Sequence, residues 1–315
     1  MKKTFNLIFL LSAVTGCEQG EDAESTPAGT VDHSACIAAS GNESILIPSE
    51  TGNHTDLSAV LAGSGIWLSW TDSFGVYTRQ YGCDGEARTD PISLSPSTTQ
   101  SVSAAVSGGT MMQMWREQHS PHLQFQRFET DGTLIDASPQ PLELVLSSDS
   151  KPVWAGYTFL TPLPGGSFGV VGLYQEFDGS NVEPFFVQID GDGQPLTELI
   201  HPVTTSGPSS SFSHFTATPD GTVHIGVISA TGSTLHSGGI YSIPPDDPGG
   251  TAQQIGDGSR FIASISSNTG GTWFILDDGQ LGMIEGTESP TLIDQRVTGE
   301  VLTPVSYTHL TLPTN

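Results

Sequence analysis

Positively charged residues are scarce in this chain: nine Lys and Arg stand against 34 Asp and Glu, which gives a formal net charge of −25. Proteins that bind nucleic acid take much of their affinity from Lys and Arg contacts to phosphates, so we expect no nucleic-acid partner. Charged residues of either sign make up only 14% of the chain. This low content excludes a charge-rich disordered protein and a coiled coil, and indicates a folded chain.

Long apolar runs and helical periodicity are also missing. The one apolar run, residues 5–14, is shorter than the roughly 20 residues of a membrane-spanning helix. Beyond it no stretch keeps a helical period, and no Gly-rich phosphate loop, zinc-protease helix or Gly-x-Ser-x-Gly turn is present. What remains is a series of short alternating apolar segments separated by Gly, Pro and Asp, which predicts an all-β fold.

The first 17 residues combine two lysines, the apolar run and the motif Val-Thr-Gly-Cys that ends at Cys17. This arrangement resembles the signal of bacterial lipoproteins. The resemblance implies that residues 1–16 are removed, that Cys17 carries the lipid, and that the protein is anchored in the cell envelope, facing the periplasm or the exterior. The alternative is an ordinary secretory signal with a chance cysteine.

The two segments that flank the remaining chain are not expected to belong to the fold. Residues 17–35 are acidic and poor in aromatics, which predicts a flexible tether. Residues 305–315 resemble a translated sequencing-adapter artefact. We therefore expect the repeat domain to occupy residues 36–304 and to be truncated at its C-terminal end.

One repeated pattern is an alternating strand that ends in Asp-Gly, a dipeptide typical of tight hairpin turns because both residues tolerate positive φ. The turn residues of its three copies are Asp84, Gly85, Asp131, Gly132, Asp192 and Gly193. A second pattern, a Gly turn between two short strands, recurs five times, at Gly65, Gly109, Gly166, Gly221 and Gly271. Together the patterns indicate units of about 50 residues.

Units of this length resemble the propeller-like repeats of bacterial surface proteins. The resemblance implies a β-propeller of four-stranded antiparallel blades, with five visible at about 55–95, 101–144, 155–203, 212–256 and 260–299. A pair of β-sandwiches and a β-solenoid are the alternatives. Residues 45–47 align with the outer strand of a blade, so we expect them to close the ring against a further, C-terminal blade.

Three cysteines are present, and lipidation of Cys17 leaves two. In an oxidising compartment an even number favours a disulfide, so we predict a bridge between Cys36 and Cys83. Two free thiols are the alternative.

Metal and cofactor signals are weak. Asp190 and Asp192 resemble part of a calcium loop, but the further carboxylates of such a loop are missing. A hairpin turn is the preferred interpretation, with a weak calcium site as the alternative and no other cofactor. His119 and His122 lie in one loop without the further ligands that zinc needs.

Residues 266–273 resemble the Asp-box of sialidases, a structural turn of propellers, except that Asn268 replaces the aspartate. Sialidase catalysis needs an arginine cluster and a tyrosine nucleophile. Arg79 and Arg127 instead lie on or beside one repeat position, which indicates a role in the scaffold. We therefore expect a binding or scaffolding module without catalytic activity, with a protein or glycan ligand and a membrane anchor. The alternative is a hydrolase or lyase that acts on polysaccharide.

Overall fold

The computed structural model describes residues 56–82, 84–97, 99–117, 122–144, 158–175, 182–200, 209–218, 220–231, 234–247, 253–257, 261–266, 271–276, 280–285 and 291–296. These residues form antiparallel sheets, each with its strands in chain order. Within the described ranges no helix is long and apolar enough to cross a membrane.

The described strands fall into five sheets. The first holds β1 (Asp56–Ala62), β2 (Gly65–Asp72), β3 (Gly75–Gly82) and β4 (Ile92–Ser95), and the second holds β5 (Thr99–Ser107), β6 (Thr110–Glu117), β7 (Leu123–Glu129) and β8 (Gln140–Leu142). The third holds β9 (Thr158–Pro162), β10 (Phe168–Gln175) and β11 (Val182–Ile189). The fourth holds β12 (Ser209–Ala217), β13 (Val223–Thr231), β14 (Thr234–Ile243) and β15 (Gln253–Asp257), and the fifth holds β16 (Phe261–Ser266), β17 (Gly271–Leu276), β18 (Gln280–Glu285) and β19 (Thr291–Arg296).

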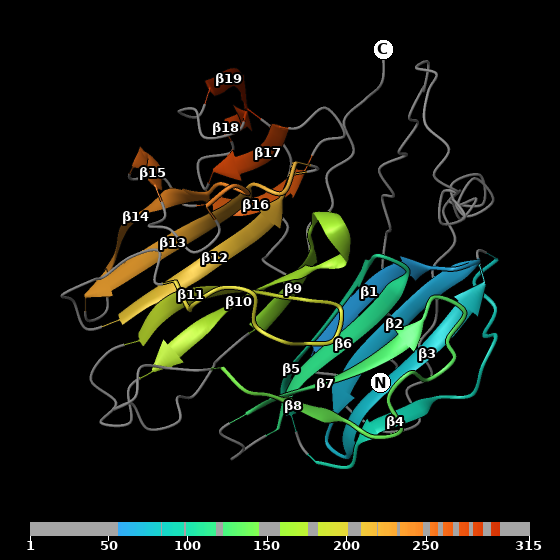
Figure 1. Cartoon of the computed structure of the whole chain (residues 1–315). Coiled ribbons are helices and arrows are strands. Elements are labelled where there is room, and N and C mark those ends of the chain that lie inside the picture. Colours follow the sequence, from blue (N-terminus) through green and yellow to red (C-terminus); the bar gives the residue numbers. More distant parts are fainter. Residues whose placement is uncertain are drawn as a thin grey trace.

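The sheets follow one another as the blades of a β-propeller. Figure 1 shows the first two at the lower right, the third in the centre and the last two at the upper left. The first strand of a sheet contacts the first strand of its neighbour, as in the pairs β1–β5, β5–β9 and β12–β16. The predicted all-β class and the four-stranded antiparallel blades are confirmed, and the five sheets coincide with the five predicted repeats.

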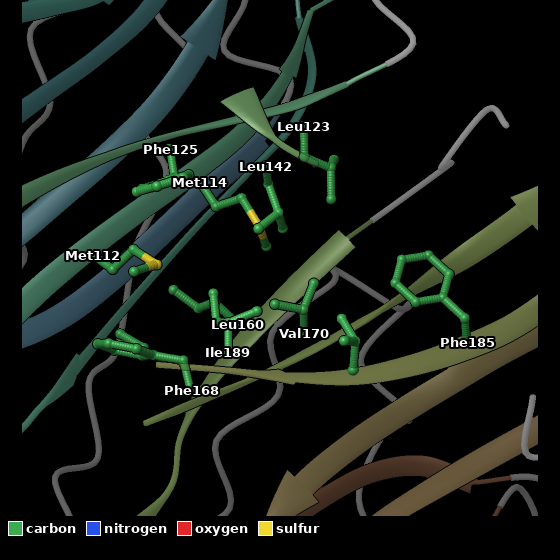
Figure 2. Packing of buried hydrophobic residues seen from close by; sticks show 12 residues of the cluster. Met112, Met114, Leu123, Phe125, Leu142, Leu160, Phe168, Val170, Phe185 and Ile189 are labelled. Atoms are coloured by element: carbon green, nitrogen blue, oxygen red, sulfur yellow. The ribbon is translucent and has the colours of Figure 1, made fainter. Parts of the chain in front are cut away.

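Apolar side chains fill the space between successive sheets. Alternate residues of β6 point to opposite faces, so Met111 and Trp115 pack toward the first sheet while Met112 and Met114 pack toward the third. Figure 2 shows Met112, Met114 and Phe125 facing residues of the third sheet. Because both faces of such a strand are buried, it reads as a nearly continuous apolar run.

Three strands of the third sheet lie among the described residues. After β11 two isolated bridges follow, Ile189 with Pro195 and Phe186 with Ile200, and the second pair exchanges both backbone hydrogen bonds at 2.8 Å. Residues 201–208, which follow this bridge, lie outside the described residues.

Candidate binding face

In each of the first four sheets the turns after the first and third strands lie at the same edge, because the strands run antiparallel in chain order. We name this edge the turn face. Its described residues are 63–64, 84–88, 108–109, 130–135, 163–167, 190–196, 218, 220–222 and 244–247. The turn between β2 and β3, around Phe74, and the end of β8, at Glu143, lie at the opposite edge.

The three Asp-Gly sequences form turns with the same backbone bond, from the glycine N–H to the carbonyl oxygen three residues earlier. The pairs are Gly85 to Gly82 at 2.9 Å, Gly132 to Glu129 at 2.9 Å and Gly193 to Asp190 at 3.1 Å. The glycine φ angles are 78°, 94° and 80°, in the left-handed region that favours glycine. In the first two copies the aspartate Oδ1 accepts the N–H two residues on, from Glu86 at 3.1 Å and from Thr133 at 2.8 Å.

In the third copy Asp190 and Asp192 make different hydrogen bonds. Asp190 Oδ1 accepts the N–H groups of Asp192 and Gln194, both at 2.8 Å. The carboxylate of Asp192 instead accepts a hydrogen bond from Arg127 on β7. Among the described residues no group of three or more His, Cys, Asp or Glu side chains is placed to hold a metal ion.

Arg127 joins the second sheet to the third. Its Nε and Nη2 donate to the two oxygens of Asp136 at 3.0 Å and 2.8 Å, and its Nη1 donates to the Gly191 carbonyl at 3.1 Å and to Asp192. The hydrogen bonds with Asp136 raise the pKa of Arg127 above its ordinary value, although burial opposes them. The guanidinium therefore acts as a permanently charged link between sheets.

Arg127 has an equivalent in each neighbouring sheet. Gln80, Arg127 and Gln188 each accept a backbone N–H with their carbonyl, from Arg88 at 2.8 Å, Ile135 at 3.1 Å and Leu196 at 2.8 Å. Their own N–H groups donate to Thr89 Oγ1 at 3.2 Å, Asp136 Oδ2 at 3.0 Å and Thr197 Oγ1 at 3.0 Å. The second sheet thus has an Arg-Asp pair where the first and third sheets have a Gln-Thr pair, and the backbone hydrogen bonds are the same in all three.

The turn glycines also fit against the preceding sheet. A Cβ added to Gly132 would lie 2.4 Å from the ring of Trp67 on β2, and one added to Gly193 would lie 2.3 Å from the ring of Phe125 on β7. Each turn therefore covers an aromatic ring of the preceding sheet, and the absence of a side chain permits this contact.

In the fourth sheet the described residues after the third strand are Pro244-Pro245-Asp246-Asp247, and none of these four is a glycine; residues 248–252 lie outside the described part. Beside Pro244 and Pro245 a cavity of about 100 Å³ opens between the third and fourth sheets. Its walls are Leu163, Pro164, Phe186, Gln188, Asp220, Gly221, Val223, Ile243, Pro244 and Pro245.

Asp220 supplies the negative charge of the cavity wall. Its Oδ1 accepts the N–H of Thr222 at 3.0 Å and the hydroxyl of Thr218. Burial raises the pKa of Asp220, but the hydrogen bonds from Thr218 and Thr222 outweigh burial and bring it below its ordinary value. The carboxylate is therefore ionised at neutral pH.

Other residues from the sequence analysis have different positions. Cys17, Cys36, Cys83, His119, residues 45–47 and residues 305–315 lie outside the described residues. Of the Asp-box resemblance, Ser266 ends β16 and Trp273 lies in β17, with residues 267–270 outside. Arg79 donates through Nε to the Thr89 carbonyl at 2.7 Å and lies 5.5 Å from the centre of the Tyr81 ring.

Asp136, Gln188 and Asp220 are not among the candidate residues that the sequence patterns indicated. The repeat alignment contained a usable signal, because Gln188 occupies the position of Arg127 one unit later. Asp220 was visible only as the residue before a turn glycine. Its place in a cavity wall depends on packing between sheets, which no local pattern encodes.

No protein-family model and no curated protein matches the chain. Among solved structures it is similar to a protein of unknown function from Dyadobacter fermentans, with TM-score 0.54, 11% identity, and coverage of 81% of this chain and 86% of that one. It is also similar to the Hadza microbial sialidase Hz136, with TM-score 0.47, 12% identity and coverage of 74% and 58%. The corresponding values for the Dos1 propeller are 0.48, 10%, 80% and 61%. This chain thus spans about six tenths of the last two proteins, and identities this low show the fold alone.

Proposed function

We propose that the protein is a binding or scaffolding module that contacts its ligand through the turn face. The observation that carries this proposal is the placement of exposed apolar side chains. Of the four large apolar side chains that are exposed in the described part, three lie on the turn face: Leu134, Ile135 and Leu196, at 48%, 39% and 54% exposure. Exposed apolar groups bordered by polar residues are typical of interaction sites.

The backbone beneath these side chains is fixed while the side chains vary. The same hydrogen bonds hold the Asp-Gly turns of three sheets. On this constant frame, equivalent positions carry Arg88, Ile135 and Leu196. A rigid scaffold that presents variable groups on loops is a common arrangement for binding proteins. A protein or glycan ligand fits this proposal.

The proposed location rests on the sequence. We propose that Cys17 is lipidated and anchors the module in the cell envelope, with residues 17–35 as a tether. Metabolic labelling with a fatty-acid analogue tests this proposal directly. Label is expected on the wild-type chain and not on a Cys17→Ala variant, and an unlabelled wild type would contradict the anchor.

Defined glycan and peptide arrays, probed with the purified chain, test the binding role. Glu129→Lys changes an exposed charge at the end of β7, directly beside the turn face, and Glu143→Lys makes the same change at the opposite edge. Array ligands are expected to lose binding to the first variant and keep binding to the second. Binding that is lost only in Glu143→Lys would contradict the proposal. Cleavage of an array glycan would also contradict it and would favour a hydrolase or lyase that acts on polysaccharide.

A further inference from the structure

At the turn face, an arginine side chain occupies the interface between the second and third sheets. There the guanidinium of Arg127 leaves β7 and reaches the backbone carbonyl of Gly191 and the carboxylate of Asp192. One unit later Gln188 holds the equivalent position, and no arginine from the third sheet can make the corresponding link. The cavity of about 100 Å³ lies at the interface between the third and fourth sheets, and Gln188 is part of its wall.

The cavity wall keeps the acceptors that a cation requires. Asp220 of the fourth sheet contributes an ionised carboxylate. Gln188 Nε2 donates to Ser167 Oγ at 2.9 Å, so its amide oxygen is the atom available to accept from a ligand. The other wall residues are apolar apart from their backbone groups.

The cavity volume of about 100 Å³ leaves room for a group of the size of a guanidinium. The planar guanidinium donates several hydrogen bonds in a fixed fork, so one group can reach both acceptors, whereas an ammonium is compact and more strongly hydrated. The chain's net charge of −25 also attracts cationic ligands.

We propose that the cavity between the third and fourth sheets binds the guanidinium of an arginine side chain from a partner polypeptide. The bound group takes the place that Arg127 occupies at the preceding interface. It donates to Asp220 and to the amide oxygen of Gln188, with its stem directed outward past Pro244 and Pro245. This inference deepens the proposed function, on which it rests, by assigning a ligand chemistry to one site on the turn face.

An NMR titration with N-acetyl-arginine methylamide tests the site without knowledge of the partner. Saturable shifts of the Gly221 and Gln188 backbone signals are expected, with a dissociation constant in the millimolar range. The citrulline counterpart, which has nearly the same shape but no charge, is expected to bind at least tenfold more weakly, and so is the lysine counterpart. Equal binding of citrulline or of lysine would overturn the assignment.

Two matched pairs of variants locate the binding. Gln188→Arg supplies the guanidinium from the chain itself and is expected to abolish the titration, whereas Gln80→Arg makes the same substitution in the first sheet and is expected to leave it unchanged. Asp220→Asn keeps an oxygen for the turn but removes the charge, and should weaken binding at least tenfold. Glu143→Gln removes a distant exposed charge and should not. Thermal unfolding of each variant confirms that it is folded.

The outcomes separate this inference from the proposed function. If arginine methylamide gives no saturable shift, or binds Gln188→Arg as well as wild type, the cavity assignment is wrong. Array ligands that still depend on Glu129 would then leave the binding role of the turn face intact. If the arrays yield no ligand but the titration behaves as described, the guanidinium site is supported and the binding role of the turn face is not. A tripeptide that contains arginine tests whether the partner is a polypeptide. If it binds no better than N-acetyl-arginine methylamide, the ligand is a small guanidinium compound and the polypeptide partner is wrong.

Discussion

Arg127 on β7 donates to Asp192 in the third sheet while two of its other nitrogens bind Asp136 in the second sheet. The two carboxylates are not equivalent. The side chain of Asp136 is 9% exposed and that of Asp192 is 78% exposed. Solvent screens the second pair, so the pair with Asp136 should dominate the stability that Arg127 provides.

Arg127→Gln should therefore lower the free energy of unfolding by about 2 kcal/mol, because Asp136 stays buried without its partner. Asp192→Asn should cost less than about 1 kcal/mol. Urea unfolding followed by circular dichroism measures both. A larger loss for Asp192→Asn than for Arg127→Gln would contradict this assignment.

The third sheet provides a rescue for the first variant. Combining Arg127→Gln with Asp136→Thr recreates the Gln188-Thr197 pair on the same backbone. The double variant should recover most of the stability lost in Arg127→Gln, since no buried carboxylate is left unpaired. Additive losses from the two substitutions would show that the repeat positions are not interchangeable.

Gly132→Ala and Gly193→Ala should destabilise the protein through both backbone strain and a clash with the rings of Trp67 and Phe125. Gly109→Ala is the matched control, because Gly109 has a φ of 83° and no atom within 4 Å of an added Cβ. The control should lose about 1 kcal/mol from strain alone, and the other two about 1–3 kcal/mol more. Equal losses in thermal unfolding at all three positions would rule out the packing contribution.

Serine hydroxyls on the first strands tie neighbouring sheets together. Ser58 Oγ accepts the N–H of Ala104 at 3.0 Å, and Ser103 Oγ accepts the N–H of Leu160 at 2.9 Å. Ser103→Ala should cost about 1–2 kcal/mol because the Leu160 N–H is buried and loses its partner. Ser138→Ala, at an exposed position, should change stability by less than about 0.5 kcal/mol. Indistinguishable denaturation midpoints would contradict a role for the serine in joining sheets.

Acid should weaken the turn that Asp220 holds. Because hydrogen bonds from Thr218 and Thr222 bring its pKa below the ordinary value of 3.8 in the folded chain, ionised Asp220 stabilises the fold above that value. This contribution is lost as the pH falls through the lower, folded-state pKa. The melting temperatures of wild type and Asp220→Asn should therefore differ at pH 7 and converge as the pH falls below the folded-state pKa of Asp220. A difference in melting temperature that grows as the pH falls would contradict a stabilising role of ionised Asp220.

The repeats and their boundaries could be predicted because local sequence patterns encode them. Alternating apolar and polar residues indicate the strands, and the Gly turns indicate the hairpins. Asp136 and Asp220 could not be recognised in advance, and Gln188 only through its repeat position. Their roles depend on which side chains meet between sheets, and that is a property of packing.

Hydrogen-exchange mass spectrometry of the chain, alone and saturated with its strongest array ligand, tests most directly whether the turn face is the binding surface. The account predicts slowed exchange in residues 84–88, 130–135, 190–196 and 218–222, with no change in residues 72–75 at the opposite edge. Protection confined to residues 72–75 would contradict it.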